Sequence, residues 1–174
     1  MLSFSALRTG LLCLGVFAIA GAATAQTKVG IVNLQKAVLD SDEIKKAGAD
    51  MDAKYKPRQQ AAQKIEQELQ GIQQQLQNGA GKLTPQAEAD LQATGQRRQR
   101  ELQHLSEDLQ NDVTAERNDI LQKTSVKMQD VVKQVAETKG LDMVVDTQSA
   151  IYFKPAMEIT TDVLAAYNKA HPAK

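Results

Sequence analysis

The stretch LDMVVDTQSAIYFKP, Leu141 to Pro155, has the pattern of two short β-strands joined by the turn DTQS. It follows a long region that is rich in glutamine and has the periodicity of helices. An isolated two-stranded hairpin is at best marginally stable in water. These strands therefore need partners from elsewhere in the chain or from other chains.

One partner is KVGIVNL, Lys28–Leu34, a run with β-branched residues that is long enough for one strand. An antiparallel helical hairpin over residues 36–139 would return the chain to the place where it left this strand. We therefore expect strand 29–33 to lie beside strand 141–145. The segment AIYFK, Ala150–Lys154, is expected to pair next, through the turn.

A last helix is expected to cover this sheet. Thr160 or Thr161 would cap its N-terminus, and Val163, Leu164 and Tyr167 would form its apolar face. Residues 26–35 and 140–174 together form this β-rich body, and we expect its core to consist mainly of strand residues. These are Val29, Ile31, Val32, Leu141, Met143, Val144, Val145, Ile151 and Phe153.

The body is too small to be stable by itself. Roughly 45 residues lie below the size at which a domain usually stands alone without a disulfide or a metal. Oligomerisation is the remaining way to stabilise it, because sheets from several chains can cover one another's edges. The fold class expected is therefore α+β, with a helical arm on an oligomeric β-body.

The first 25 residues predict a cleaved secretory signal peptide. Arg8 precedes the ten-residue apolar run LLCLGVFAIA, and Ala23-Thr24-Ala25 forms an A-x-A site with cleavage after Ala25. A run of ten apolar residues is too short to span about 30 Å of hydrocarbon as a helix. The single cysteine, Cys13, leaves with this segment, so no disulfide is expected.

The remaining composition argues against catalysis and nucleic-acid binding. Without Arg8, 20 of the 21 basic residues remain against 21 acidic ones, a net charge of −1. The only histidines are His104 and His171, and there is no cluster with metal-ligand spacing and no phosphate-binding loop. Asp142 and Asp146 are an alternative carboxylate pair, although turn or strand-edge positions are several times more common for such residues. We expect a non-enzyme that binds no cofactor.

The central region predicts a helical hairpin whose tip lies at NGAGKLTP, Asn78–Pro85. Its glycines stop one helix, and Thr84 with Pro85 starts the next. The first helix has a heptad stripe of Ile44, Gly48, Met51, Tyr55, Arg58, Ala62, Ile65, Leu69, Ile72 and Leu76. The second has a less regular stripe of Leu91, Leu102, Leu105, Leu109, Val113, Ile120, Val131 and Val135. Fifteen glutamines in residues 59–110 indicate that this coiled-coil arm stands in solvent.

Two local features of the arm are candidates for a special role. Pro57 interrupts the hydrogen bonding of the first helix, and Gly71 and Gly95 weaken the two helices at what we expect to be one level. These three residues predict a hinge in the arm. The alternative, given equal weight, is that the two glycines lie at one level by chance. A basic cluster near the tip is a candidate contact for an anionic lipid or an acidic client. The alternative is that it is an ordinary solvated face of the helix. It consists of Arg97, Arg98 and Arg100.

The two ends of the chain resemble the Skp (OmpH-like) family of periplasmic chaperones. The resemblance is carried by KVGIVNLQKAVLDS near the start and by GLDMVVDTQSAIYFKPAMEITTDVLAAYNK at the end. It implies a homotrimer with a β-barrel body made by three chains and three helical arms around a cavity. It also implies an ATP-independent holdase that takes up unfolded outer-membrane proteins and prevents their aggregation.

The charge of this chain departs from the family's pattern. Family members are often strongly basic, whereas this chain is close to neutral. We therefore expect contact with the membrane or with lipopolysaccharide to be weak at most. The alternative function, favoured by the regular heptads, is a structural coiled-coil spacer or adaptor of the cell envelope.

Overall fold

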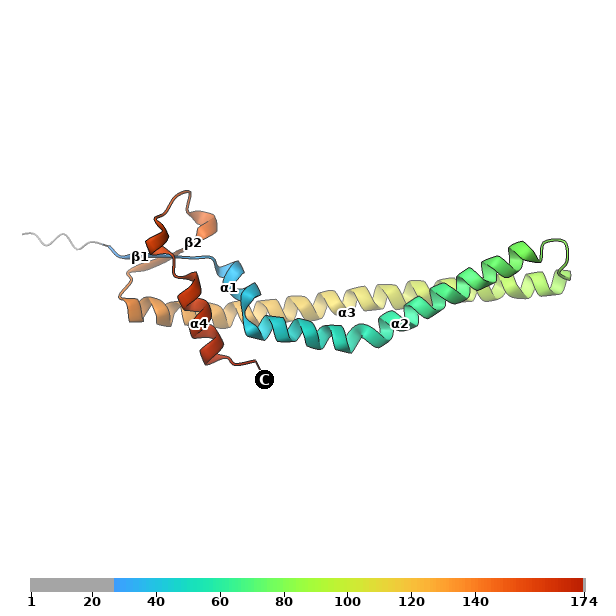
Figure 1. The fold of residues 1–174 in the computed structure, drawn as a ribbon, viewed down its shortest axis with the longest axis horizontal. Helices are drawn as coiled ribbons and strands as arrows, with labels where there is room; N and C mark the ends of the chain where they lie inside the picture. Colours follow the sequence, from blue (N-terminus) through green and yellow to red (C-terminus); the bar gives the residue numbers. More distant parts are fainter. Residues whose placement is uncertain (1–26, 174) are drawn as a thin grey trace, which may run out of the picture.

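The computed structural model describes residues 27–173 and shows long helices attached to a small two-stranded sheet (Figure 1). The expectation of this combination is confirmed. The predicted signal peptide, with Cys13 and the cleavage site after Ala25, lies outside the described residues. Closure of a barrel between chains stays a prediction.

The arm consists of two antiparallel helices, α2 (Asp42–Asn78) and α3 (Pro85–Lys139). At 1.5 Å per residue they are about 55 and 83 Å long. The hydroxyl oxygen of Thr84 accepts a hydrogen bond from the backbone N–H of Ala87, which starts α3 after the tip. Gly140, in the left-handed conformation with φ 61°, ends α3.

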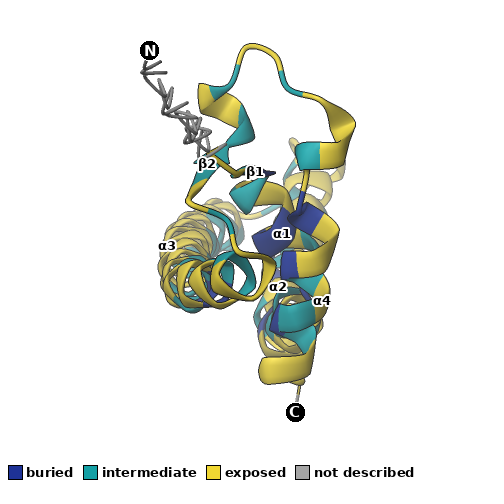
Figure 2. Ribbon diagram, turned by 90° about the vertical axis from the view of Figure 1, so that its left-hand side faces the viewer, coloured by how far each residue is buried: buried dark blue, intermediate teal, exposed yellow. Residues whose placement is uncertain are grey.

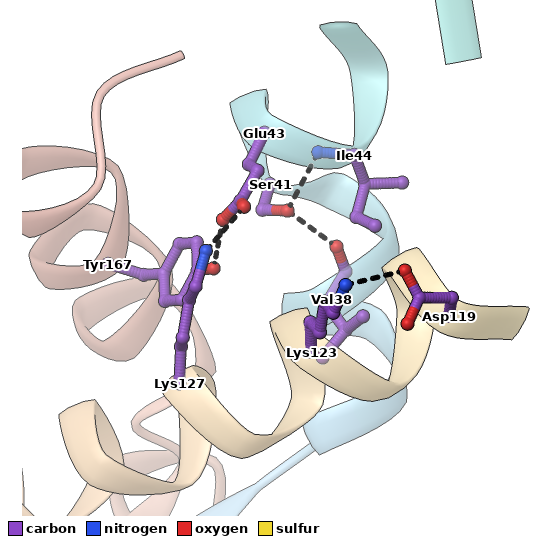
Figure 3. A network of polar contacts seen from close by, with 8 residues as sticks. All are labelled: Val38, Ser41, Glu43, Ile44, Asp119, Lys123, Lys127 and Tyr167. Carbon is purple, nitrogen blue, oxygen red and sulfur yellow. Dashed lines mark hydrogen bonds and ion pairs between the residues drawn. The ribbon is translucent and has the colours of Figure 1, made fainter. Parts of the chain in front are cut away.

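A short helix, α1 (Leu34–Asp40), precedes the arm and is separated from α2 by Ser41. The buried hydroxyl of Ser41 donates to the carbonyl of Val38 at 2.7 Å and accepts from the N–H of Ile44 at 3.4 Å (Figure 3). It thereby ends one helix and caps the next, while its own backbone is extended. The helical region therefore divides at Ser41, and α1 packs with the body.

The sheet joins the two ends of the chain. Strands β1 (Val29–Val32) and β2 (Met143–Asp146) pair in parallel, with Val29 opposite Met143 and Val32 opposite Asp146. The parallel direction follows from the unequal helices, because α3 is 18 residues longer than α2 and runs past the start of the arm (55 against 37 residues). The chain turns back at Gly140 and enters β2 in the direction of β1.

The strand expected at Ala150–Lys154 is wrong for the single chain. The Asp146 side chain accepts hydrogen bonds from the N–H groups of Leu34 and Gln148, which turns the chain into a 3-10 helix at Thr147–Ser149. Residues 150–154 then project as a loop above the sheet (Figure 1). Strand β2 therefore lacks the expected partner, and Glu158, farther along the chain, bridges to Ile31 of β1.

The last helix, α4 (Thr160–Ala170), packs against α1 and α3 and closes the core, although its predicted cap is wrong. Ile159 occupies the cap position, and the Thr160 hydroxyl instead accepts from the N–H of Asn33 at 2.9 Å. The buried residues gather around α1 and α4 in Figure 2. This core is mainly helical: Val32, Ala37, Val38, Met128, Val131, Ile159, Val163 and Tyr167.

Candidate binding surfaces

The residues predicted for the body core occupy three different environments. Ile31 and Val32 are buried, whereas Met143 is 49% exposed and Ile151 is fully exposed. The other five are half-buried: Val29, Leu141, Val144, Val145 and Phe153. Within one chain the sheet is thus only partly covered, and several of its apolar side chains remain open to contact.

An apolar band runs along one side of the molecule, from the sheet to the root of the arm. It consists of three adjoining hollows, of which the first two share Leu34 and Asp146 and the last two share Leu39 and Leu121. No residue of α4 lines any of them. The large apolar members of the band are Val32, Leu34, Val38, Leu39, Ile44, Met51, Val113, Ile120, Leu121, Val132, Leu141, Met143 and Val144.

The sequence contained part of this band without showing its role. Ile44, Met51, Val113 and Ile120 all belong to the predicted stripes and were expected to face only the opposite helix. The sequence signal for the hollow at the arm root was Gly48, because a stripe position without a side chain leaves space between the helices.

A polar junction connects the arm to the body on the α4 side. The carboxylate of Glu43, in the first turn of α2, accepts hydrogen bonds from Lys127 of α3 at 2.6 Å and from the phenol of Tyr167 of α4 (Figure 3). The ring of His171 lies 4.7 Å from that of Tyr167. Glu43 therefore joins three helices, and no local sequence signal predicts it because its partners are 84 and 124 residues away.

The ionisation of this junction favours the observed contacts. Burial works to raise the pKa of Glu43, but the hydrogen bonds from Lys127 and Tyr167 outweigh it and hold the pKa below its usual value. Burial and the bond to Glu43 raise the pKa of the Tyr167 phenol. Glu43 therefore stays ionised as the acceptor and Tyr167 stays protonated as the donor at neutral pH.

A second set of polar contacts ties the two helices together around Pro57. Glu116 accepts from Lys54 at 2.6 Å and from the Tyr55 hydroxyl at 2.5 Å, and Arg58 pairs with Asp112 at 2.5 Å. The hydrogen bonds from Lys54 and Tyr55 hold the pKa of Glu116 below its usual range. Pro57 thus lies inside α2 between two cross-links, which hold the two helices firmly together in the part of the arm nearer the body. We call this part the proximal arm.

The two glycines of the predicted hinge lie close together toward the tip. A methyl group on Gly95 would contact Ile72, the neighbour of Gly71, at 3.5 Å, whereas one on Gly71 would meet no atom within 4 Å. The two glycines are thus at one level of the arm. The cross-link next to them is the pair between Arg98 and Glu68 at 2.9 Å.

The basic cluster near the tip is partly occupied by contacts within the arm. Arg98 pairs with both Glu68 and Glu101, and Arg97 donates to the hydroxyl of Thr94 at 3.1 Å. Arg100 is exposed. Only part of the cluster's charge is therefore directed outward.

Residues 27–173 offer neither a membrane-spanning helix nor a metal site. None of the helices there is both long enough and apolar enough to cross a membrane. The same residues contain no group of three or more His, Cys, Asp or Glu side chains arranged to hold a metal ion.

Comparison with known proteins identifies the family. The sequence profile described as "Outer membrane protein (OmpH-like)" matches residues 28–167. The chain belongs to the OmpH-like family. A Skp-like protein of Pseudomonas aeruginosa is 25% identical over 150 residues, covering 86% of this chain and 89% of that one. The chaperone protein Skp of Pectobacterium atrosepticum is 29% identical over 153 residues, with 86% and 90% covered.

A solved structure shares the fold of this OmpH-like chain. The crystal structure of a putative outer membrane chaperone (OmpH-like) from Caulobacter crescentus matches with a TM-score of 0.72 and 18% identity, covering 99% of this chain and 94% of that one. The family match begins at Lys28, immediately before β1, and ends at Tyr167, the residue that reaches Glu43. It therefore includes the sheet, the whole arm and the junction between them.

The junction predicts a pH-dependent contribution to stability. Because the pKa of Glu43 is lowered on folding, the contribution of its carboxylate is present at pH 7 and is lost as the pH falls below about 4.5. The groups that face it are Lys127, Tyr167 and His171, with Lys46 and Asp50 on the rim of the same hollow. We expect Glu43→Gln to lower the free energy of unfolding at pH 7 by about 0.5–1 kcal/mol, allowing for solvent screening.

Urea unfolding followed by circular dichroism at pH 7, 5 and 3.5 measures this difference. The control is Asp50→Asn, which removes an exposed i,i+4 pair with Lys46 on the same helix and should have a smaller effect. A Glu43→Gln protein as stable as wild type at pH 7, or a difference that persists unchanged at pH 3.5, would contradict the assignment.

Proposed function

We propose that the chain is an ATP-independent holdase chaperone that binds unfolded outer-membrane β-barrel proteins and prevents their aggregation. The observation that carries this proposal is the family match over residues 28–167, which spans the body and the whole arm. It is supported by relatives named as a Skp-like protein and as the chaperone protein Skp, which align over most of both chains. Export to the periplasm, after signal cleavage at Ala25, is part of the same proposal.

The form of the arm suits a holdase. An unfolded membrane barrel exposes alternating apolar side chains and unpaired backbone groups, a composition that aggregates. Long arms with largely polar surfaces can surround such a chain and separate it from others. Many weak contacts at high effective concentration give strong overall binding while each contact breaks quickly. Release then needs no nucleotide.

Assembly into a homotrimer is supported by the apolar side chains and the sheet edge that a single chain leaves exposed. Ile151 and Tyr152 are 107% and 82% exposed, and Met143 at the edge of the sheet is 49% exposed. Within residues 27–173 the sheet has two strands, so β2 has no neighbouring strand on its outer edge in this part of the chain. We propose that copies of the chain cover these groups and close the small sheets into a shared barrel.

The alternative function is a structural spacer or adaptor of the cell envelope. It is favoured by the regular heptads of α2 and by the cross-links around Pro57, which stiffen the proximal arm. A spacer would bind one fixed partner. A holdase instead accepts unrelated unfolded clients, so an aggregation assay separates the two functions.

The aggregation assay uses the purified protein and a urea-unfolded outer-membrane β-barrel protein. After dilution of the urea, we expect turbidity to be suppressed at about one trimer per client, with a soluble complex of matching mass by light scattering. Unfolded barrels of several unrelated sequences should behave alike. If all of them aggregate as they do alone, the chain is no holdase and the spacer function is favoured.

The trimer is tested by Ile151→Asp and Val144→Asp. Ile151 is fully exposed in one chain, so a charge there costs several kcal/mol only if another chain buries it. We expect sedimentation as a smaller species with most arm helicity retained at low temperature. Ala156→Asp, at an exposed position farther along, is the control. An Ile151→Asp protein that sediments as wild type would place the interface elsewhere.

The proposed hinge is tested by replacing Gly71 and Gly95 together with alanine. Both sites accept a methyl group, and each change stabilises helix by about 1 kcal/mol. We expect a narrower distribution of spin-label distances between arm tips. Gly48→Ala, which adds the same helix stability at the root, should leave the distribution unchanged. A double variant with the wild-type distribution would exclude a hinge at these glycines.

A further inference from the structure

The hollow of the apolar band that lies farthest from the sheet forms a groove between α2 and α3 at the root of the arm. It has a volume of about 340 Å³, within the range of sites that take small apolar groups. We call it the arm-root groove, and its apolar lining is Leu39, Ile44, Ala47, Met51, Val113, Ile120 and Leu121, with Gly48 between them. These residues come from α1 and both arm helices.

The arm-root groove opens on one edge of the arm because the other edge is closed by ion pairs. On α3, Asp112, Glu116 and Lys127 bind α2 side chains. They recur at steps of four and eleven residues and so lie along one line of the helix. Val113 and Ile120 lie on the neighbouring row of the α3 surface, and both form part of the groove wall. The proximal arm thus has a polar, cross-linked edge and an apolar, open edge.

Gly48 keeps the groove open. A methyl group at this position would meet no atom within 4 Å, so the space above Gly48 belongs to the groove and is not filled from the facing helix. Glycine in a helix interior is less favourable than alanine. The helix therefore gives up stability at a position where a larger side chain would occupy the groove.

The folded chain itself offers little that could fill this groove. The large apolar side chains exposed on the described residues are Leu39, Val126, Met143, Ile151 and Tyr152. Leu39 already lines the groove, Val126 lies on α3 nearer the body, and the other three lie on the sheet and its loop. The arm of a second copy, whose exposed side chains at this level are polar, would present no large apolar group. In the proposed trimer, Met143, Ile151 and Tyr152 are covered within the shared body, so an apolar occupant of this groove would come from a chain that is not folded in this way.

The charges on the rim favour an uncharged, extended occupant. Asp52 borders the groove on α2 and Arg117 borders it on α3, so the rim has one charge of each sign and no net charge. A carboxylate can accept from backbone N–H groups, and a guanidinium can donate to backbone carbonyls. An unfolded membrane strand has both unpaired backbone groups and apolar side chains on alternate positions.

We propose that the arm-root groove is a docking site for an apolar, extended segment of an unfolded client, whose side chains enter above Gly48 and contact Met51 and Ile120. The proposal rests on the proposed holdase function and specifies where on the arm a client strand binds. It also explains why the groove continues the apolar band of the body, since a client held there would lie between the arm and the assembled sheet.

The test is a set of substitutions at two adjacent positions of α2. Gly48→Leu fills the groove, Gly48→Ala gains helix stability with little filling, and Ala49→Leu adds the same apolar side chain at an exposed position outside the groove. Dissociation constants for a urea-unfolded outer-membrane β-barrel protein are measured by client fluorescence. We expect Gly48→Leu to weaken binding about tenfold, with the other two within twofold of wild type.

The outcomes distinguish a failure of the proposed docking site from a failure of the proposed holdase function. Gly48→Leu within twofold of wild type, at unchanged helicity and mass, would overturn the docking site while the holdase function stands. A changed oligomeric mass would also overturn it, because the occupant would then be a second copy. Failure of wild type to hold any client would overturn the proposed function itself.

A crosslinking measurement covers the case in which Gly48→Leu is poorly folded. The sequence contains no cysteine after Cys13, so Gly48→Cys and Ala49→Cys each accept a single benzophenone label. We expect at least fivefold more client crosslinking from position 48. Equal crosslinking from the two positions would overturn the docking site.

Discussion

The structure depends on bringing the two ends of the chain back together. β1 and β2 are separated by more than a hundred residues, and several contacts hold the ends beside each other. They include the parallel ladder, the bond from the Ile159 N–H to the carbonyl of Ile31, and the bond from the Asn33 N–H to Thr160. A flexible loop of that length would lose considerable entropy on closure. Here almost all of the intervening chain is helix, and the tip between α2 and α3 has only six residues. The arm therefore also serves to close the body.

The arm could be predicted from the sequence because its signals are local. Heptad spacing, the glycines at the tip and the Thr84–Pro85 start of α3 each act within a few residues, and the structure forms its helices accordingly. The pairing of β1 with β2 was also accessible, since a hairpin must return the chain to its origin. The break at Ser41 was not, because a single serine in a polar helical sequence is common and only its buried bonds to Val38 and Ile44 show its role.

The errors at the C-terminal end have a common cause. β-Propensity correctly described the side chains of Ala150–Lys154 but not their pairing with β2, because the hydrogen bonds to the Asp146 side chain turn the chain into a 3-10 helix directly after that strand. Likewise Thr160 has the chemistry of a helix cap, but its hydroxyl is used by Asn33, 127 residues away. The candidate surfaces behave in the same way: the sequence supplied Ile44, Met51 and Ile120, whereas the opening between them and the ion-paired edge opposite are properties of how two helices pack. Local patterns specify what a residue can do, and long-range contacts decide which of these it does.

The unequal lengths of α2 and α3 also determine how the molecule responds to load. α3 continues without interruption from the tip through the arm and into the body, where Met128 and Val131 are part of the core. No flexible linker separates arm and body on this helix, while on the α2 side the chain is fixed by Ser41 and Glu43. An outward load on the arm, such as a client would exert under the proposed function, would therefore bend the continuous α3 at its boundary with the body, because no joint lies at that boundary. Such a bent helix would straighten once the load is removed, so the base of the arm would behave as a cantilever, separately from the hinge proposed nearer the tip.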